Sequence, residues 1–96
     1  MSESSDTTVR PVPTHEVSVV LPAHLHARPA GALVQAAARF SSTVEIAYGG
    51  KSVNARSVLA VMSLGALAGA TVVLRATGVD ADQALTALAE ILATVE

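Results

Sequence analysis

The sequence has no cysteine, and its aromatic side chains are limited to Phe40 and Tyr48. Without cysteine the chain can form no disulfide, no thiolate metal site and no thiol nucleophile. Aromatic residues make up 2% of the 96 residues and hydrophobic residues 51%. The core must therefore be built from Ala, Val, Leu and Ile side chains. The length is that of one small domain.

Concentrated positive charge, a long apolar run and an apolar leader are also missing. The formal net charge is -2, with no block of like charges, which argues against nucleic-acid binding. No stretch approaches the ~20 apolar residues of a membrane-spanning helix. The polar start MSESSDTTVRPVPT lacks the apolar core of a secretory signal. We therefore expect a cytoplasmic protein that binds neither nucleic acid nor membranes.

The pattern along the chain predicts a tail followed by one domain. Residues 1–14 are rich in Ser, Thr and Pro without periodicity, so we expect a disordered tail there. Over residues 15–96 the periodicity predicts strands at 16–21, 43–48, 51–54 and 71–77, and helices at 27–39, at 57–64 and from 80 onward, with a Gly49-Gly50 hairpin turn. The order is βαββαβα. It predicts an α+β fold with helices on one side of a mostly antiparallel sheet and the other side in water.

Capping signals and apolar stripes refine the helices. Ser57 is expected to cap the second helix, and Asp80 with Gln83 three residues on is a variant of the capping box. The expected buried stripes are Ala30, Leu33, Val34 and Ala37 in the first helix, and Ala84, Leu88, Ile91 and Val95, flanked by Leu85 and Leu92, in the last.

The segment LHARPAG, residues 25–31, sets His26 just ahead of Pro29, which fits the first turn of a helix. The free N–H groups of a helix N-terminus favour an anion. Near neutral pH a substantial fraction of imidazole is neutral and nucleophilic, and Arg28 offers a planar charged fork for two phosphate oxygens. The pattern indicates that His26 is itself phosphorylated and that Arg28 stabilises the phosphoryl group.

Two other interpretations concern the same segment. His26 could serve only as a helix cap, with Arg28 as a solvated charge, and local chemistry alone leaves that alternative open. A zinc site built from His15, His24 and His26 would need further ligands, and no cysteine exists to complete it. We predict neither a metal nor a cofactor.

The second helix carries two further candidate features. Ser57 is a candidate for regulatory phosphorylation, because a phosphate at a helix start suits the helix dipole. Val58, Leu59 and Met62 make this helix apolar over more of its circumference than one core stripe needs. We predict that these three residues form a partner-docking patch. Deeper burial of the short helix is the alternative.

With these residues in place, residues 15–95 closely resemble HPr, the histidine-containing phosphocarrier family of the bacterial phosphoenolpyruvate-dependent sugar phosphotransferase system. The resemblance is carried by LHARPA at 25–30 and by NARS at 54–57 followed by MSLG at 62–65, at the family spacing. Gly78 and Asp80, before the last helix, also fit. The resemblance implies an open-faced β-sandwich with a four-stranded antiparallel sheet and three helices on one face.

The resemblance also implies roles. His26 would accept a phosphoryl group on Nδ1 from phosphorylated enzyme I and pass it to a histidine of an enzyme IIA domain, with Arg28 steadying the group. The docking patch would contact both partners. Ser57 aligns with the serine that an HPr kinase/phosphorylase modifies in many Gram-positive members. We expect a monomeric phosphoprotein that acts as a relay intermediate and not as an enzyme.

Three features depart from the family pattern. Ala23 and His24 replace the Asn-Gly that often precedes Leu-His, the tail before His15 is longer, and Arg56 stands where lysine is common. These departures leave room for a carrier in a side branch, either the nitrogen-related phosphotransferase chain or a dihydroxyacetone-kinase relay. A regulatory protein that no longer carries phosphate is disfavoured by the retained His26 and Arg28.

Overall fold

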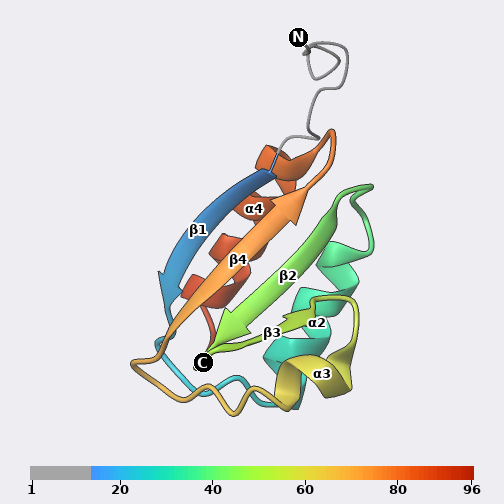
Figure 1. The fold of residues 1–96 in the computed structure, drawn as a ribbon. Helices are drawn as coiled ribbons and strands as arrows, with labels where there is room; N and C mark the ends of the chain where they lie inside the picture. Colours follow the sequence, from blue (N-terminus) through green and yellow to red (C-terminus); the bar gives the residue numbers. More distant parts are fainter. Residues whose placement is uncertain (1–13) are drawn as a thin grey trace, which may run out of the picture.

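The computed structural model describes residues 14–96. Its elements are β1 (Thr14–Val20), α2 (Ala27–Ala37), β2 (Thr43–Tyr48), β3 (Lys51–Asn54), α3 (Val58–Met62), β4 (Thr71–Thr77) and α4 (Ala81–Ala93). This is the predicted βαββαβα order (Figure 1). The tail expected over residues 1–14 lies outside the described residues except for Thr14, which already belongs to β1.

The four strands form one antiparallel sheet in the order β1-β4-β2-β3. Leu74 of the central strand β4 faces Val17 of β1 on one side and Ile46 of β2 on the other. Helices α2 and α4 contact each other on one face of the sheet, and α3 packs against α2 and β3 at one end (Figure 1). The arrangement is the expected open-faced sandwich. None of the helices in residues 14–96 is long and apolar enough to cross a membrane.

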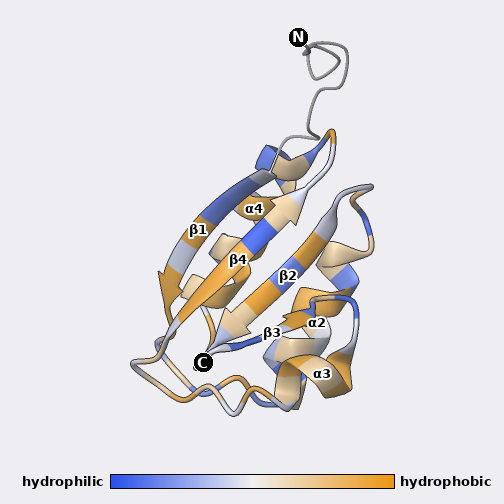
Figure 2. Ribbon diagram, viewed as in Figure 1, coloured by the Kyte–Doolittle hydropathy of each residue, from blue (hydrophilic) through white to orange (hydrophobic). Residues whose placement is uncertain are grey.

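The two faces of the sheet differ in polarity because strand side chains alternate. On the helix-covered face, β4 buries Val72, Leu74 and Ala76. On the open face, Arg75 Nε donates to Glu16 Oε2 of β1 at 2.6 Å. Figure 2 shows this alternation of hydrophobic and hydrophilic residues along β4 and β2. The open face is therefore a solvated polar surface.

The core is aliphatic, as the composition required. Its largest fully buried apolar side chains are Leu21, Leu33, Val44, Ile46, Val61, Val72, Leu74, Leu88 and Leu92. Phe40 and Tyr48 only pack against its edge. The buried faces of α2 and α4 are rotated slightly from the predicted stripes. Val34 and Ile91, which were predicted to be buried, are half-buried, whereas Ala36 and Ala81, which lay outside the predicted stripes, are buried.

Two helices end earlier than the periodicity predicted. α2 ends at Ala37, where 39 was expected, and α3 ends at Met62, where 64 was expected. In both cases the chain leaves the helix through N–H groups that bond three residues back, as in Phe40 to Ala37 and Leu64 to Val61. Such tight final turns keep the apolar periodicity for two more residues without continuing the α-helix.

The capping-box prediction at α4 is wrong. Asp80 is the residue before the helix, but its side chain makes no capping hydrogen bond. Its carboxylate instead accepts from the Ser41 N–H at 2.8 Å and the Ser42 N–H at 2.9 Å, and from the Ser42 hydroxyl. The Ser42 hydroxyl, followed by the Ser41 N–H, holds the pKa of Asp80 below its ordinary value of 3.8. Asp80 therefore joins the turn after α2 to the start of α4.

Candidate functional site

His26 lies at the end of the loop between β1 and α2, and buried leucines fix that loop. Leu21 and Leu25 are 1% and 5% exposed. Their N–H groups donate to Ala70 at 2.9 Å and to Ala66 at 3.0 Å, both in the segment between α3 and β4. Between these attachments and α2, the His26 ring stays half-exposed at the surface. The His26 ring is therefore accessible from solvent, while the backbone on its N-terminal side is held in place.

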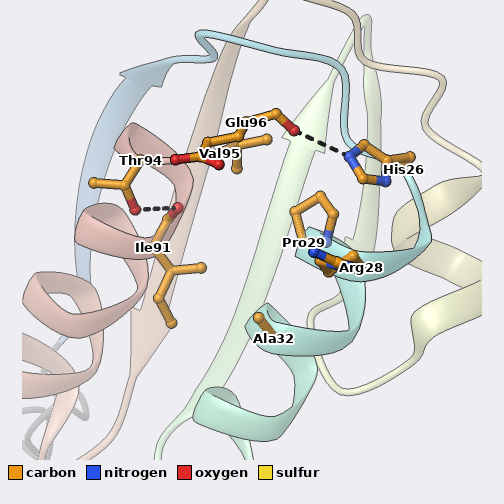
Figure 3. A pocket seen from close by; sticks show the side chains of 8 residues that line it. All are labelled: His26, Arg28, Pro29, Ala32, Ile91, Thr94, Val95 and Glu96. Atoms are coloured by element: carbon orange, nitrogen blue, oxygen red, sulfur yellow. Dashed lines mark hydrogen bonds between the residues drawn. The ribbon is translucent and has the colours of Figure 1, made fainter.

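The His26 ring does not cap the helix. His26 occupies the N-cap position of α2 with extended backbone, φ -84° and ψ -170°, and its side chain makes no capping hydrogen bond. Its Nε2 lies 3.2 Å from the main-chain oxygen of Glu96 (Figure 3). Because a carbonyl oxygen can only accept, Nε2 carries the proton and Nδ1 of the neutral ring holds the lone pair. In this tautomer Nδ1 is the ring nitrogen that keeps a free lone pair.

The first turn of α2 has donors with no partner. The first intrahelical bond runs from the Ala30 N–H to the His26 carbonyl at 3.0 Å, and Pro29 has no N–H to leave unsatisfied. Within residues 14–96, the N–H groups of Ala27 and Arg28 make no hydrogen bond. The first turn also carries no acidic residue. The start of α2 can therefore accept an anion beside the His26 ring.

Arg28 is exposed, and its guanidinium makes no hydrogen bond or ion pair with the rest of residues 14–96. Arg75, by contrast, is held by Glu16 at 2.5 Å on the open face of the sheet. An unpaired guanidinium has its full set of donors available for an incoming anion. The structure leaves Arg28 free for the role that the sequence predicted.

The end of α4 completes the site, which the sequence did not predict. A cavity of about 490 Å³ lies between the start of α2 and the end of α4. It is lined by His26, Arg28, Pro29 and Ala32 from one side and by Ile91, Thr94, Val95 and Glu96 from the other (Figure 3). No sequence signal could have found the second group, because only tertiary packing brings residues 91–96 to His26.

The three histidines are not brought together. His24 and His26 have ring centroids 4.5 Å apart, inclined at 40°, but His15 lies on β1 with its Nδ1 3.4 Å from Asp82 of α4. No group of three His, Cys, Asp or Glu side chains in residues 14–96 could hold a metal ion. The alternative zinc site is therefore not formed among these residues.

Helix α3 presents the second set of predicted residues. Ser57 caps it as predicted, its Oγ accepting from the Ala60 N–H at 3.2 Å. Leu59 is 81% exposed and Met62 39% exposed. Val58 is half-buried and packs against the core. Of the predicted docking patch, Leu59 and Met62 are therefore exposed to solvent, while Val58 packs against the core.

Comparison with known proteins identifies close relatives. The family model described as "PTS HPr component phosphorylation site" matches residues 13–94. Phosphocarrier protein HPr of Buchnera aphidicola is 38% identical over 82 residues, which are 85% of this chain and 96% of that protein. The crystal structure of phosphocarrier protein HPr from Bacillus anthracis is 40% identical, with 84% of this chain and 96% of that chain covered and a TM-score of 0.74. Crh, a catabolite-repression protein of Bacillus subtilis, is 45% identical, with 79% of this chain and 87% of that chain covered and a TM-score of 0.68. The crystal structure of Crh is described as a domain-swapped dimer.

Proposed function

The chain belongs to the HPr family of phosphocarrier proteins, and we propose that it carries a phosphoryl group on His26 between enzyme I and enzyme IIA domains in sugar uptake. The observation that carries this proposal is the hydrogen bond from His26 Nε2 to the Glu96 main-chain oxygen. That bond leaves the Nδ1 lone pair for bond formation. The unpartnered N–H groups of Ala27 and Arg28 support it as donors to phosphoryl oxygens.

Each transfer exchanges one nitrogen–phosphorus bond for another. The Nδ1 lone pair of His26 forms the new bond to phosphorus, while the bond from phosphorus to the donor group of enzyme I breaks and its electron pair stays on that group. The His26 ring then carries phosphorus on Nδ1, a proton on Nε2 and a positive charge, which the hydrogen bond to Glu96 stabilises. Transfer to enzyme IIA reverses these steps with His26 as leaving group.

Arg28 and the start of α2 act on the phosphoryl oxygens. Phosphoryl transfer needs mainly positioning and charge stabilisation. Arg28 supplies a permanent positive charge without a competing carboxylate partner in residues 14–96. The α2 N-terminus supplies oriented N–H dipoles. Together they would hold the group during both transfers without forming a bond to it.

The exposed Leu59 and Met62 would contact both partners, and Ser57 beside them would regulate that contact. A phosphate from an HPr kinase/phosphorylase would add about two negative charges at the edge of the patch. Because Ser57 Oγ already accepts from the Ala60 N–H, a phosphate there suits the start of α3. The relatives described above are HPr and Crh proteins and give no support to the nitrogen-related or dihydroxyacetone-kinase alternatives.

We propose that the carrier is a cytoplasmic monomer. All seven residues of β1 pair with β4 of the same chain, which supports a monomer in which β1 is not exchanged between chains. Size-exclusion chromatography with light scattering should give the mass of one chain. A stable dimer, as described for Crh, would overturn this part of the proposal.

The main test is phosphorylation by enzyme I and phosphoenolpyruvate. Intact-mass analysis should show one added phosphoryl group that is labile in acid and stable in base. His26→Ala should accept none, whereas His15→Ala, which changes a histidine on β1, should be phosphorylated normally. A mass increase that persists in His26→Ala would overturn the assignment.

A further inference from the structure

The His24 ring lies against the His26 ring, at a position where the family often has glycine. The ring centroids are 4.5 Å apart, and the His26 N–H donates to the His24 carbonyl at 3.0 Å. His24 is exposed, so its ring can gain or lose a proton without burying a charge. We propose that His24 is a positioning residue whose protonation stabilises the phosphoryl group on His26. The inference rests on the proposed function.

The charges around His26 explain why His24 can act as the pH-sensitive group. Arg28 of α2 faces the site with a permanent positive charge, and Glu96 faces it from the segment after α4. The segment between α3 and β4, residues 63–70, contributes no charged residue. Histidine is the side-chain type whose charge can change near neutral pH, and the His24 ring is the imidazole that contacts the His26 ring. Its effect is therefore separable from that of Arg28.

The sign of the coupling follows from the two states of His26. A phosphoryl group brings about two negative charges within a few ångströms of the His24 ring, so the protonated ring is favoured when His26 is phosphorylated. Thermodynamic linkage then requires that a protonated His24 favours phosphorylation by the same factor. At this separation, near the surface and in salt, we expect a factor of about five.

The test compares wild type with three substitutions at His24. The equilibrium of phosphorylation by enzyme I at a fixed phosphoenolpyruvate-to-pyruvate ratio is measured from about pH 5.5 to 8.5. His24→Gln and His24→Phe should match wild type at the alkaline end and hold about fivefold less phosphoryl group at the acid end. His24→Lys should keep the advantage at every pH. The phenylalanine variant retains a ring without a proton site and so separates charge from ring contact.

A second readout is the NMR titration of the His24 ring. Phosphorylation of His26 should move its midpoint upward by about 0.7 pH units, the equivalent of a factor of five. His15 is the internal control, because it lies on β1 five residues before the end of the strand. At the rise of an extended strand this is about 16 Å from the point where the His26 loop begins. Its midpoint should not move.

The outcomes distinguish this inference from the function on which it depends. If His26 is phosphorylated but the His24 midpoint stays fixed, or if His24→Gln follows the wild-type pH profile, the inference is wrong. Retention of the pH effect in His24→Phe would also overturn it. Absence of any acid-labile phosphate on wild-type protein would instead overturn the proposed function.

Discussion

Asp80 and Ser42, 38 residues apart in sequence, are joined by two hydrogen bonds, because the Asp80 carboxylate accepts from both the N–H and the hydroxyl of Ser42. Ser42 follows the end of α2 and Asp80 precedes α4. The candidate site lies at the opposite ends of these two helices, where the start of α2 meets the end of α4. The Asp80–Ser42 contact therefore helps to fix the relative position of the helices that form the site.

This contact should make stability depend on pH in acid. The pKa of Asp80 is lowered in the folded state, mainly by the Ser42 hydroxyl. Its stabilising contribution is therefore complete above the ordinary value of 3.8 and is lost as the pH falls through the folded-state pKa. Asp80→Asn should lower the urea midpoint at neutral pH and remove this part of the acid dependence. Glu90→Gln, at an exposed position of α4, is the control, and equal acid profiles for Asp80→Asn and wild type would contradict the prediction.

Gly78 should not tolerate a side chain. Its φ is +147°, and an added Cβ would lie 2.7 Å from Ser42 Cα. Gly78→Ala should therefore destabilise the protein by about 2 kcal/mol or more, through clash and backbone strain together. Gly31→Ala in α2 meets nothing within 4 Å and should stabilise by about 0.5–1 kcal/mol. Urea unfolding measures both, and an unchanged midpoint for Gly78→Ala would show that the loop relaxes freely.

Arg28→Ala should slow phosphoryl transfer from enzyme I about tenfold, because a charge-assisted donor to the phosphoryl oxygens is lost. Arg28→Lys should recover part of the rate, since it restores the charge but not the planar fork. Rapid-quench kinetics with phosphorylated enzyme I provide the measurement. Arg39→Ala removes an exposed arginine just beyond the other end of α2 and should transfer normally. A wild-type rate in Arg28→Ala would remove the proposed role.

Ser57→Asp should weaken binding to enzyme I about fivefold or more, because it adds negative charge at the edge of the apolar docking patch. Ser57→Ala should bind normally but lose about 1 kcal/mol of stability with the cap of α3. Ser18→Asp adds the same charge to an exposed position of β1 and serves as control. Calorimetric titration with enzyme I measures the affinity of each variant. Equal affinities for Ser57→Asp and wild type would show that α3 is not the docking surface.

The β2–β3 hairpin and the cap of α3 were predictable because local chemistry determines them. Gly49 and Gly50 have positive φ values of 61° and 80°, as their hairpin turn requires, and the strands on either side have the predicted limits. Ser57 caps α3 through a bond three residues away. Each of these features depends on residues close together in the sequence.

The features that the sequence did not reveal depend on contacts between distant residues. Asp80 has the residue type of a helix cap, but two serines before β2 compete for its carboxylate. Ile91 carries the stripe periodicity, yet it lines the cavity beside α2 and is only half-buried. Periodicity specifies which side chains share a face of a helix and does not specify what that face meets.

The sheet order has a consequence for the growing chain. Of the strands in residues 14–96, β1 is synthesised first, but its partner in the sheet is β4, whose first residue is Thr71. The loop that holds His26 is likewise attached to Ala66 and Ala70. During translation from the N-terminus, the β2–β3 hairpin can form early, whereas the His26 loop can be fixed only after residues 66–70 have been made. Under the proposed function, the ability to accept a phosphoryl group should therefore arise together with completion of the fold.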